Sequence, residues 1–291
     1  MLFIVGIIIV VSAVLGGYSM HNGDLKLLWQ PSEFIIILGA AIGGFCISNP
    51  MNVVKSSIKA LRFLFKGHPY SRADYTELIL LFFNITKVMK VRGMLEIENH
   101  VEHPEESQIF SQAPSIVGHK INLEFIRDNL RLLVMGVDNP HQFEAMIDSE
   151  IEVLASELKA PGRAILSLGD SLPALGIIAA VLGVIVTMRS IVEPPEILGG
   201  LIAAALVGTF LGVLFSYGLF IPIGHFVSEY SELQILYLQS IKTGFIAYLN
   251  GNPPIVIAEF IRKTVPESVR PSFQDAEMAI SNQVTPNTQK R

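Results

Sequence analysis

Two apolar stretches, residues 169–183 and 197–223, follow a helical pattern, and each contains one proline, Pro173 or Pro222. No charged residue lies deep inside either stretch. A proline removes one backbone hydrogen bond, at a cost of about 3 kcal/mol in a soluble helix interior, and a lipid bilayer offers no water to replace that bond. The pattern therefore predicts membrane helices that bend or open a path. Any ionisable group on such a path is expected to come from another chain.

Composition places the chain among membrane proteins. Hydrophobic residues make up 51% of it and charged residues 16%, whereas soluble domains usually carry about 25% charged residues. The mean hydropathy is +0.50. A single cysteine, Cys46, excludes a disulfide framework and a cysteine-based metal site, and the net charge of −5 argues against nucleic-acid binding.

Four stretches approach the roughly 20 apolar residues that cross a bilayer. A signal peptide is a poor interpretation of the first stretch, because no Lys or Arg precedes it and no A-x-A site follows it. The predicted spans are 2–18, 34–47 with an extension over 51–54, 172–188, and 197–223. The predicted fold class is an all-α integral membrane protein with four transmembrane helices and a large cytoplasmic helical domain.

Basic residues beside the spans predict the orientation. Residues 51–73 contain five Lys or Arg side chains and no acidic one, and such loops stay in the cytoplasm. The large segment before span three and both termini are therefore expected on the cytoplasmic side. The predicted parts are transmembrane helices 1 and 2 (1–54), a cytoplasmic helical domain (55–168), transmembrane helices 3 and 4 (169–225), and a cytoplasmic helix with a tail (226–291).

Helical patterns continue outside the spans. They cover 75–90, 121–135, 141–158 and 226–249, and prolines at 104, 114, 140 and 161 are expected at helix boundaries. The polar stretch from Gln274 onward is expected to be disordered. Two glycine pairs, Gly39 with Gly43 and Gly208 with Gly212, have the spacing that lets membrane helices approach closely, either within one chain or between subunits.

Three motifs then give the chain a family resemblance. GDSLPALGIIAAVLGVI (169–185), LVGTFLGVLFSYGLFIPI (206–223) and the pair LNGNPPIVIAEFIRKTV (249–265) with RPSF (270–273) resemble the A subunit of the bacterial flagellar stator, of the MotA/PomA type. The resemblance implies a ring of five A subunits in the inner membrane around two B subunits. Each B subunit would supply an intramembrane aspartate and a peptidoglycan anchor.

The resemblance also assigns residues to an ion path. Pro173, shortly after Asp170, is either a hinge or a first-turn residue, and Pro222 is expected to kink the end of span four. Thr209 either lines the path or bonds back to its own helix. Ala180 falls where sodium-driven relatives carry a threonine. A methyl group offers sodium no oxygen ligand, so the expected ion is a proton.

A second set of residues would contact the rotor protein FliG. Glu98 matches the family's glutamate, whereas Lys90 stands where the family has an arginine. Arg92 lies two residues further on, and residues two apart do not share a helix face. Which cation meets the rotor is therefore left open.

Other function classes are weaker interpretations. One alternative is an ExbB/TolQ-like protein, which also forms an oligomeric proton channel but drives envelope transport. The other is a membrane scaffold that conducts no ions. His100, Glu102 and His103 are too few to predict a metal site, and no catalytic motif occurs. We expect no enzyme activity and no cofactor, with a proton as the transported ion.

Overall fold

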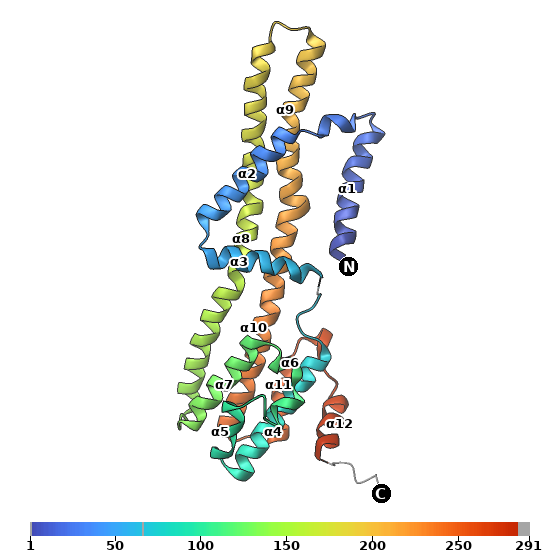
Figure 1. The fold of residues 1–291 in the computed structure, drawn as a ribbon. Helices are drawn as coiled ribbons and strands as arrows, with labels where there is room; N and C mark the ends of the chain where they lie inside the picture. The colour runs from blue at the N-terminus through green and yellow to red at the C-terminus, as the bar shows by residue number, and fades with distance from the viewer. Residues whose placement is uncertain (1, 66, 285–291) are drawn as a thin grey trace. The chain divides into compact units, whose positions relative to one another are not determined.

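The computed structural model describes residues 2–65 and 67–284, and every regular element within them is a helix (Figure 1). The contacts divide the chain into two compact units, unit 1 (residues 1–67 and 157–231) and unit 2 (68–156 and 232–291). Two long helices, α8 (Pro140–Thr187) and α10 (Ile221–Leu249), contribute residues to both units. An all-α fold with membrane-length helices is confirmed.

Unit 1 holds the apolar helices. Within the described residues, four helices are long and apolar enough to cross a membrane. They are α1 (Leu2–Met20), α2 (Pro31–Ser48), α8, and α9 (Pro195–Phe215) with its continuation into α10; short turns η1 (Leu25–Leu28) and η4 (Met188–Ser190) lie between them. One apolar cluster joins α2, α8 and α9 through Ile37, Leu172, Ala179 and Leu211.

A stripe of glycines on α8 brings it against the following helices. The glycine stripe consists of Gly162, Gly169, Gly176 and Gly183, spaced by seven residues. A methyl group built on Gly176 would lie 2.7 Å from the Gly208 carbonyl oxygen, and one built on Gly183 would lie 2.8 Å from the Ala205 methyl carbon. Small residues let membrane helices pack by backbone contact. The Gly208–Gly212 pair therefore serves packing within the chain, whereas Gly39 and Gly43 have no neighbour within 4 Å.

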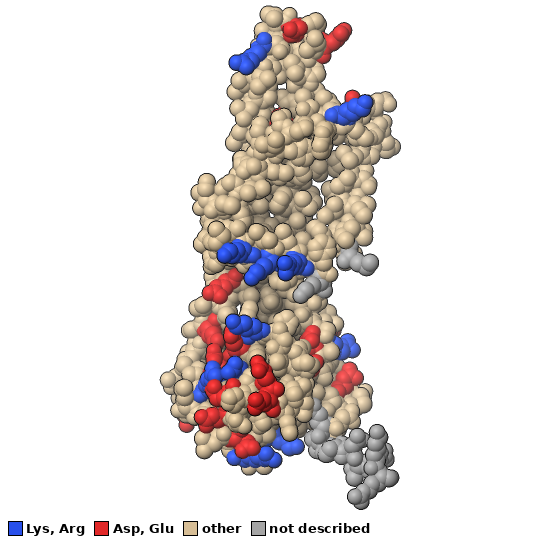
Figure 2. All heavy atoms as spheres, in the orientation of Figure 1, with Lys and Arg blue, Asp and Glu red and all other residues tan. Residues whose placement is uncertain are grey.

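The predicted extension of span two over 51–54 is wrong. The chain turns at Asn49 and Pro50, which are both extended, and a separate helix, α3 (Met51–Ala60), follows with η2 (Leu61–Phe65). Buried Ala60 and Leu64 pack against Ile165, Ile223 and Val227. The basic residues of α3 and η2 are exposed, and Figure 2 shows blue spheres gathered at this helix below an almost entirely tan surface.

Unit 2 packs around α4 (Arg72–Arg92). Ser71 caps this helix by accepting a hydrogen bond from the Asp74 backbone, and the Asp74 carboxylate accepts one from the Ser71 backbone at 2.6 Å. Phe82 of α4 contacts Phe245 of α10 edge-on, with 5.0 Å between ring centroids. The remaining helices of this unit are α5 (Leu95–Glu102), η3 (Phe110–Gln112), α6 (Pro114–Val117), α7 (Lys120–Val134), α11 (Pro254–Thr264), η6 (Glu267–Val269) and α12 (Phe273–Val284).

Two further expectations fail. Pro161 does not end a helix, because α8 continues through it. The Ser231 hydroxyl donates to the Leu158 carbonyl at 2.7 Å, beside the position where the proline interrupts the backbone bonding. The predicted disorder from Gln274 is wrong over α12, whose first turn is stabilised by Ser272 accepting from the Asp275 backbone at 3.0 Å. Residues 285–291 lie outside the described residues.

Candidate functional site

Pro173 lies in the interior of α8, so its interpretation as a first-turn residue is wrong. In an α-helix the missing N–H would have paired with the carbonyl four residues earlier, here that of Gly169. A methyl group built on Gly169 would lie 3.1 Å from the Ile221 backbone nitrogen and 3.3 Å from Phe220 Cβ. The break in α8 therefore faces the residues that directly precede Pro222.

The chain around Pro222 has its own irregularity. Residues Ser216–Phe220 (η5) form a π-helical turn between α9 and α10, and the Ile221 N–H donates to the Ser216 carbonyl. Pro222 is the second residue of α10, so it lies at a junction in a helical path that continues to Leu249. π-turns inside helices recur at functional sites and at kinks. The missing hydrogen bond at Pro173 and the π-turn before Pro222 thus lie beside each other on neighbouring helices.

Ala180 of α8 and Thr209 of α9 lie in or beside another contact between these two helices. A methyl group built on Gly208 would lie 3.1 Å from the Ala180 backbone nitrogen, so Thr209 directly follows a close contact between α8 and α9. Ala180 is 9% exposed and Thr209 is half-buried. Thr209 makes no hydrogen bond within the described part of the chain, whereas Thr187 donates to the Gly183 carbonyl. The back-bonded interpretation of Thr209 therefore does not hold.

Asp170 lies on the exposed side of α8, and its neighbour Ser171 donates to the Leu168 carbonyl at 2.7 Å. Neither 171–188 nor 197–224 contains an Asp, Glu, Lys, Arg or His. These two stretches therefore offer an ion backbone carbonyls and the hydroxyls of Ser171, Thr187, Thr209, Ser216 and Tyr217, but no acid or base of their own.

A buried carboxylate nevertheless reaches this region from α2. Glu33 is only 6% exposed, and its Oε2 atom has no hydrogen-bond partner among the described residues. A methyl group built on Gly208 would lie 2.5 Å from that oxygen. The sequence prediction missed Glu33 because it began span two at Phe34. The signal was an acidic residue directly at the edge of an apolar run, two residues after Pro31.

The residues predicted to meet the rotor lie in unit 2. Lys90 is exposed, and its Nζ donates to the Gly251 carbonyl at 3.0 Å. Arg92, also exposed, pairs with Glu96 at 3.2 Å. Glu98 is exposed on α5 and lines a hollow of about 340 Å³ with Val101, Glu102, Arg131, Val134 and Met135. Lys90 thus binds the backbone of the LNGNPP loop, whereas Arg92 pairs with a residue four positions further along the chain.

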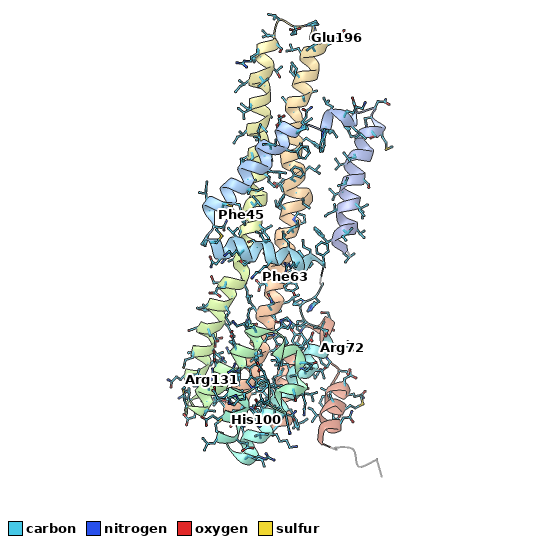
Figure 3. The ribbon with its side chains drawn as sticks, in the orientation of Figure 1. Phe45, Phe63, Arg72, His100, Arg131 and Glu196 are labelled. Carbon is cyan, nitrogen blue, oxygen red and sulfur yellow. The ribbon has the colours of Figure 1, made fainter. Side chains whose placement is uncertain are left out.

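Arg131 is the cation that the sequence prediction did not select (labelled in Figure 3). Its guanidinium donates to both carboxylate oxygens of Glu102, at 2.7 and 2.9 Å, and to Asp128 at 2.9 Å. The hydrogen bonds from Arg131 lower the pKa of Glu102. No group of three His, Cys, Asp or Glu side chains suited to a metal ion occurs in the described parts of the chain, and His100 Nδ1 lies 2.8 Å from Ser107 Oγ.

Comparison with known proteins places the chain in a family. The model described as motility protein A N-terminal matches residues 4–93, and that of the MotA/TolQ/ExbB proton channel family matches residues 118–240. Motility protein A of Salmonella typhimurium is 39% identical over 290 residues, covering 100% of this chain and 98% of the relative; that of Escherichia coli is 40% identical over 277 residues, covering 95% and 94%. The chain belongs to the motility protein A family.

Solved structures of the family share the fold. The structure of C. jejuni MotAB matches with a TM-score of 0.75 at 19% identity, covering 93% of this chain and 98% of that one. The flagellar MotAB stator complex from Bacillus subtilis matches with a TM-score of 0.72 at 23% identity, covering 91% and 96%. The family model that matches residues 118–240 describes a proton channel family, which is not a known class of enzyme.

The structure therefore brings the predicted ion-path residues into one unit of this family member. Pro173 and Pro222 lie on facing helices, and Ala180 contacts Gly208, the residue that precedes Thr209. Asp170 lies near Pro173 on α8 but on its exposed side. Lys90, Arg92 and Glu98 lie together in the other unit, on α4 and α5. Their functional roles remain predictions.

Proposed function

We propose that this chain is the A subunit of a proton-driven flagellar stator, which forms a proton path with a B subunit and couples proton flow to torque. One observation carries the proposal. In a motility protein A family chain, two proline-interrupted helices face each other where Gly169 meets Phe220 and Ile221, and the adjoining stretches 171–188 and 197–224 contain no acid or base. A carboxylate supplied by the partner would complete this path. Both termini and unit 2 would then lie in the cytoplasm, as the basic residues 55–72 predict.

The energy scale fits such a mechanism. One proton crossing 100 mV releases roughly 2.3 kcal/mol, similar to the roughly 3 kcal/mol that a proline costs in a helix interior. A helix that already lacks a bond at Gly169 can change its bend within that range, whereas a fully bonded helix resists. Repeated small bends in a ring of five such subunits would convert proton flow into rotation. Ala180 offers no oxygen ligand, which favours a proton over sodium.

Unit 2 would transmit this motion to the rotor protein FliG. Lys90 and Glu98 present opposite charges on neighbouring helices, and charge complementarity guides such contacts. Arg92 pairs with the carboxylate of Glu96, whereas Lys90 bonds only to the neutral Gly251 carbonyl within the described chain, so Lys90 is the proposed cation.

The first test is swimming and torque in a strain whose own copy carries Pro173→Ala. Alanine restores the hydrogen bond to Gly169, so we expect loss of torque with an unchanged amount of protein in the membrane. Pro161→Ala is the matched control, because Ser231 already supports the backbone beside Pro161, and it should swim normally. Normal torque in Pro173→Ala would remove the hinge role.

The rotor contact is tested by Glu98→Lys, with exposed Glu124→Lys as the control. Loss of torque in the first variant alone is expected. The function itself is tested by deletion of the gene in a strain without a second stator set, where normal motility would overturn the proposal. Vesicles containing the chain with and without its B partner should pass protons only with it, whereas a scaffold would pass none in either case.

A further inference from the structure

The buried carboxyl group of Glu33 has no role in the function proposed above. It is the third residue of α2, and its backbone N–H donates to the carbonyl of Gln30, the residue that precedes the helix. An acid at this position of a surface helix would accept a hydrogen bond from the first turn or remain in water. Glu33 does neither: its Oε2 atom has no hydrogen-bond partner among the described residues, and 94% of its surface is removed from solvent.

The surroundings of Glu33 are apolar and uncharged. On α8 its carboxylate approaches Gly183, where a methyl group would lie 3.7 Å from Oε1, and on α9 it approaches Gly208. The other atoms around these two glycine positions belong to Ala179, Ala180 and Ala205. The packed stretches 34–48 of α2, 171–188 of α8 and 197–215 contain no Asp, Glu, Lys, Arg or His. The nearest acid along the chain, Asp24, accepts a bond from the Lys26 backbone.

An ionised carboxylate is unstable in such a place. Its cost in the membrane is several kcal/mol unless a cation or hydrogen bonds compensate it, and Glu33 has neither in the described chain. Binding one proton removes the charge and lets the group pack against Gly208. Release of that proton would drive the carboxylate toward water and away from α9. The contact between α2 and the α8–α9 layer therefore depends on one proton.

We propose that Glu33 is a second proton-binding site, carried by this chain itself, beside the helix layer that contains Ala180 and Thr209. The carboxylate takes up a proton to become the neutral acid and returns the same proton on release. Its location at Gly208 means that uptake and release alter the packing that positions Thr209. This proposal rests on the proposed proton path, to which it adds an acid that belongs to the A subunit.

The direct test is infrared spectroscopy of the intact complex with its B partner in lipid, titrated between acidic and alkaline pH. A protonated carboxyl group gives a carbonyl stretching band that disappears on ionisation. We expect the wild type to show such a titrating band that is missing in Glu33→Gln, which keeps the size and shape of the side chain. Glu196→Gln, at the exposed tip of the α8–α9 hairpin (labelled in Figure 3), should keep the band.

The second measurement is proton flux into vesicles at a series of pH values for the same proteins. Glu33→Gln should lose one titration from the dependence of flux on pH, and Glu33→Asp should retain it with a shifted midpoint. If Glu33→Gln shows an infrared band and a flux profile identical to those of the wild type, the proposal is wrong. If the wild type passes no protons, the proposed function fails, and the infrared band still decides whether Glu33 binds a proton.

Discussion

Different interactions stabilise the interior of each of the two units. In unit 1, α8 meets α9 and α10 through glycine and alanine, with backbone against backbone at Gly176 and Gly208. In unit 2, large aromatic rings fill the core, and ion pairs such as Lys242 with Asp148 at 2.8 Å join its helices. Water drives the burial of rings in unit 2, whereas lipid offers no such force between helices and leaves close packing to supply the attraction.

This difference suggests what each unit can do. Backbone contacts without side-chain interdigitation allow small tilts and slides, which a subunit that responds to single protons needs. A core of interlocked rings resists such changes, which suits a unit that transmits force. Four substitutions test this contrast.

The largest effect is expected for Gly176→Leu. The side chain would enter the space now occupied by the Gly208 carbonyl and the Gly212 backbone, neither of which can move aside. The cost should exceed the roughly 1–3 kcal/mol of ordinary overpacking, so that little folded protein is recovered from membranes. Gly39→Leu, at a position without a neighbour within 4 Å in this chain, is the control. Equal recovery of both variants would contradict the backbone-contact description of unit 1.

Phe82→Ala should have the next largest effect. Phe82 is 1% exposed and packs on Phe245, and removal of a buried phenylalanine usually costs about 3–5 kcal/mol. The measurement is the thermal unfolding of the purified full chain. Phe273→Ala, at a ring that is 58% exposed, should cost far less. A similar loss in both would show that unit 2 is not held by its aromatic core.

Lys242→Met should have a moderate effect. Lys242 Nζ binds Asp148 at 2.8 Å and Glu144 at 2.9 Å with its side chain 19% exposed, so methionine leaves two acids without their cation. Hydrogen bonds to charged groups contribute about 1.5–3 kcal/mol. Lys120→Met removes a pair whose lysine is 84% exposed, and such exposed pairs contribute about 0–1 kcal/mol. An unfolding temperature equally lowered in both variants would count against a special role of Lys242.

The smallest effect is expected for Glu150→Gln, and it should depend on pH. Burial raises the pKa of Glu150, although Asn129 donates to its carboxylate at 2.9 Å. An acid with a raised pKa in the folded state destabilises the fold while ionised, and that penalty vanishes as pH falls through the raised value. Glutamine keeps an acceptor for Asn129 without the charge, so the variant should be slightly more stable at pH 7.

The advantage of Glu150→Gln should be absent at about pH 4, near the ordinary pKa of glutamate. Exposed Glu152→Gln is the control, and it should match the wild type at both pH values. A gain that persists unchanged at the lower pH would rule out burial of the charge as its cause.

The sequence predicted much of the fold because long apolar runs and basic flanks are strong signals. The spans over α1, α9 and the membrane part of α8, and the helices α4 and α7, follow from composition and periodicity. Pro161 was misjudged because local rules favour a helix end there, whereas the Ser231 hydroxyl and the contact of Gly162 with Ser228 support a continuous helix. That compensation comes from residues about 70 positions away.

The sequence likewise predicted only part of the candidate site. The motifs selected Pro173, Pro222, Ala180 and Thr209, but their arrangement across α8, α9 and α10 required the packing of the glycine stripe. The sequence prediction omitted Glu33 and Arg131 because neither residue belongs to a motif. Their importance comes from partners: Gly208 lies against the first, and Glu102 holds the second with two hydrogen bonds.

The π-turn at Ser216–Phe220 also constrains the length of the chain. A π-turn closes with one residue more than an α-turn, so deleting one residue there would leave an ordinary α-turn and keep Gly224 and Ser228 against Leu166 and Gly162, whereas a deletion outside the turn would rotate the following helix by about 100°. Point substitutions in this stretch leave the count unchanged and keep those contacts aligned. Over evolution, this junction is therefore expected to accept exchanges of residue type and the loss of one residue, whereas single deletions in the helices on either side of it should be rejected.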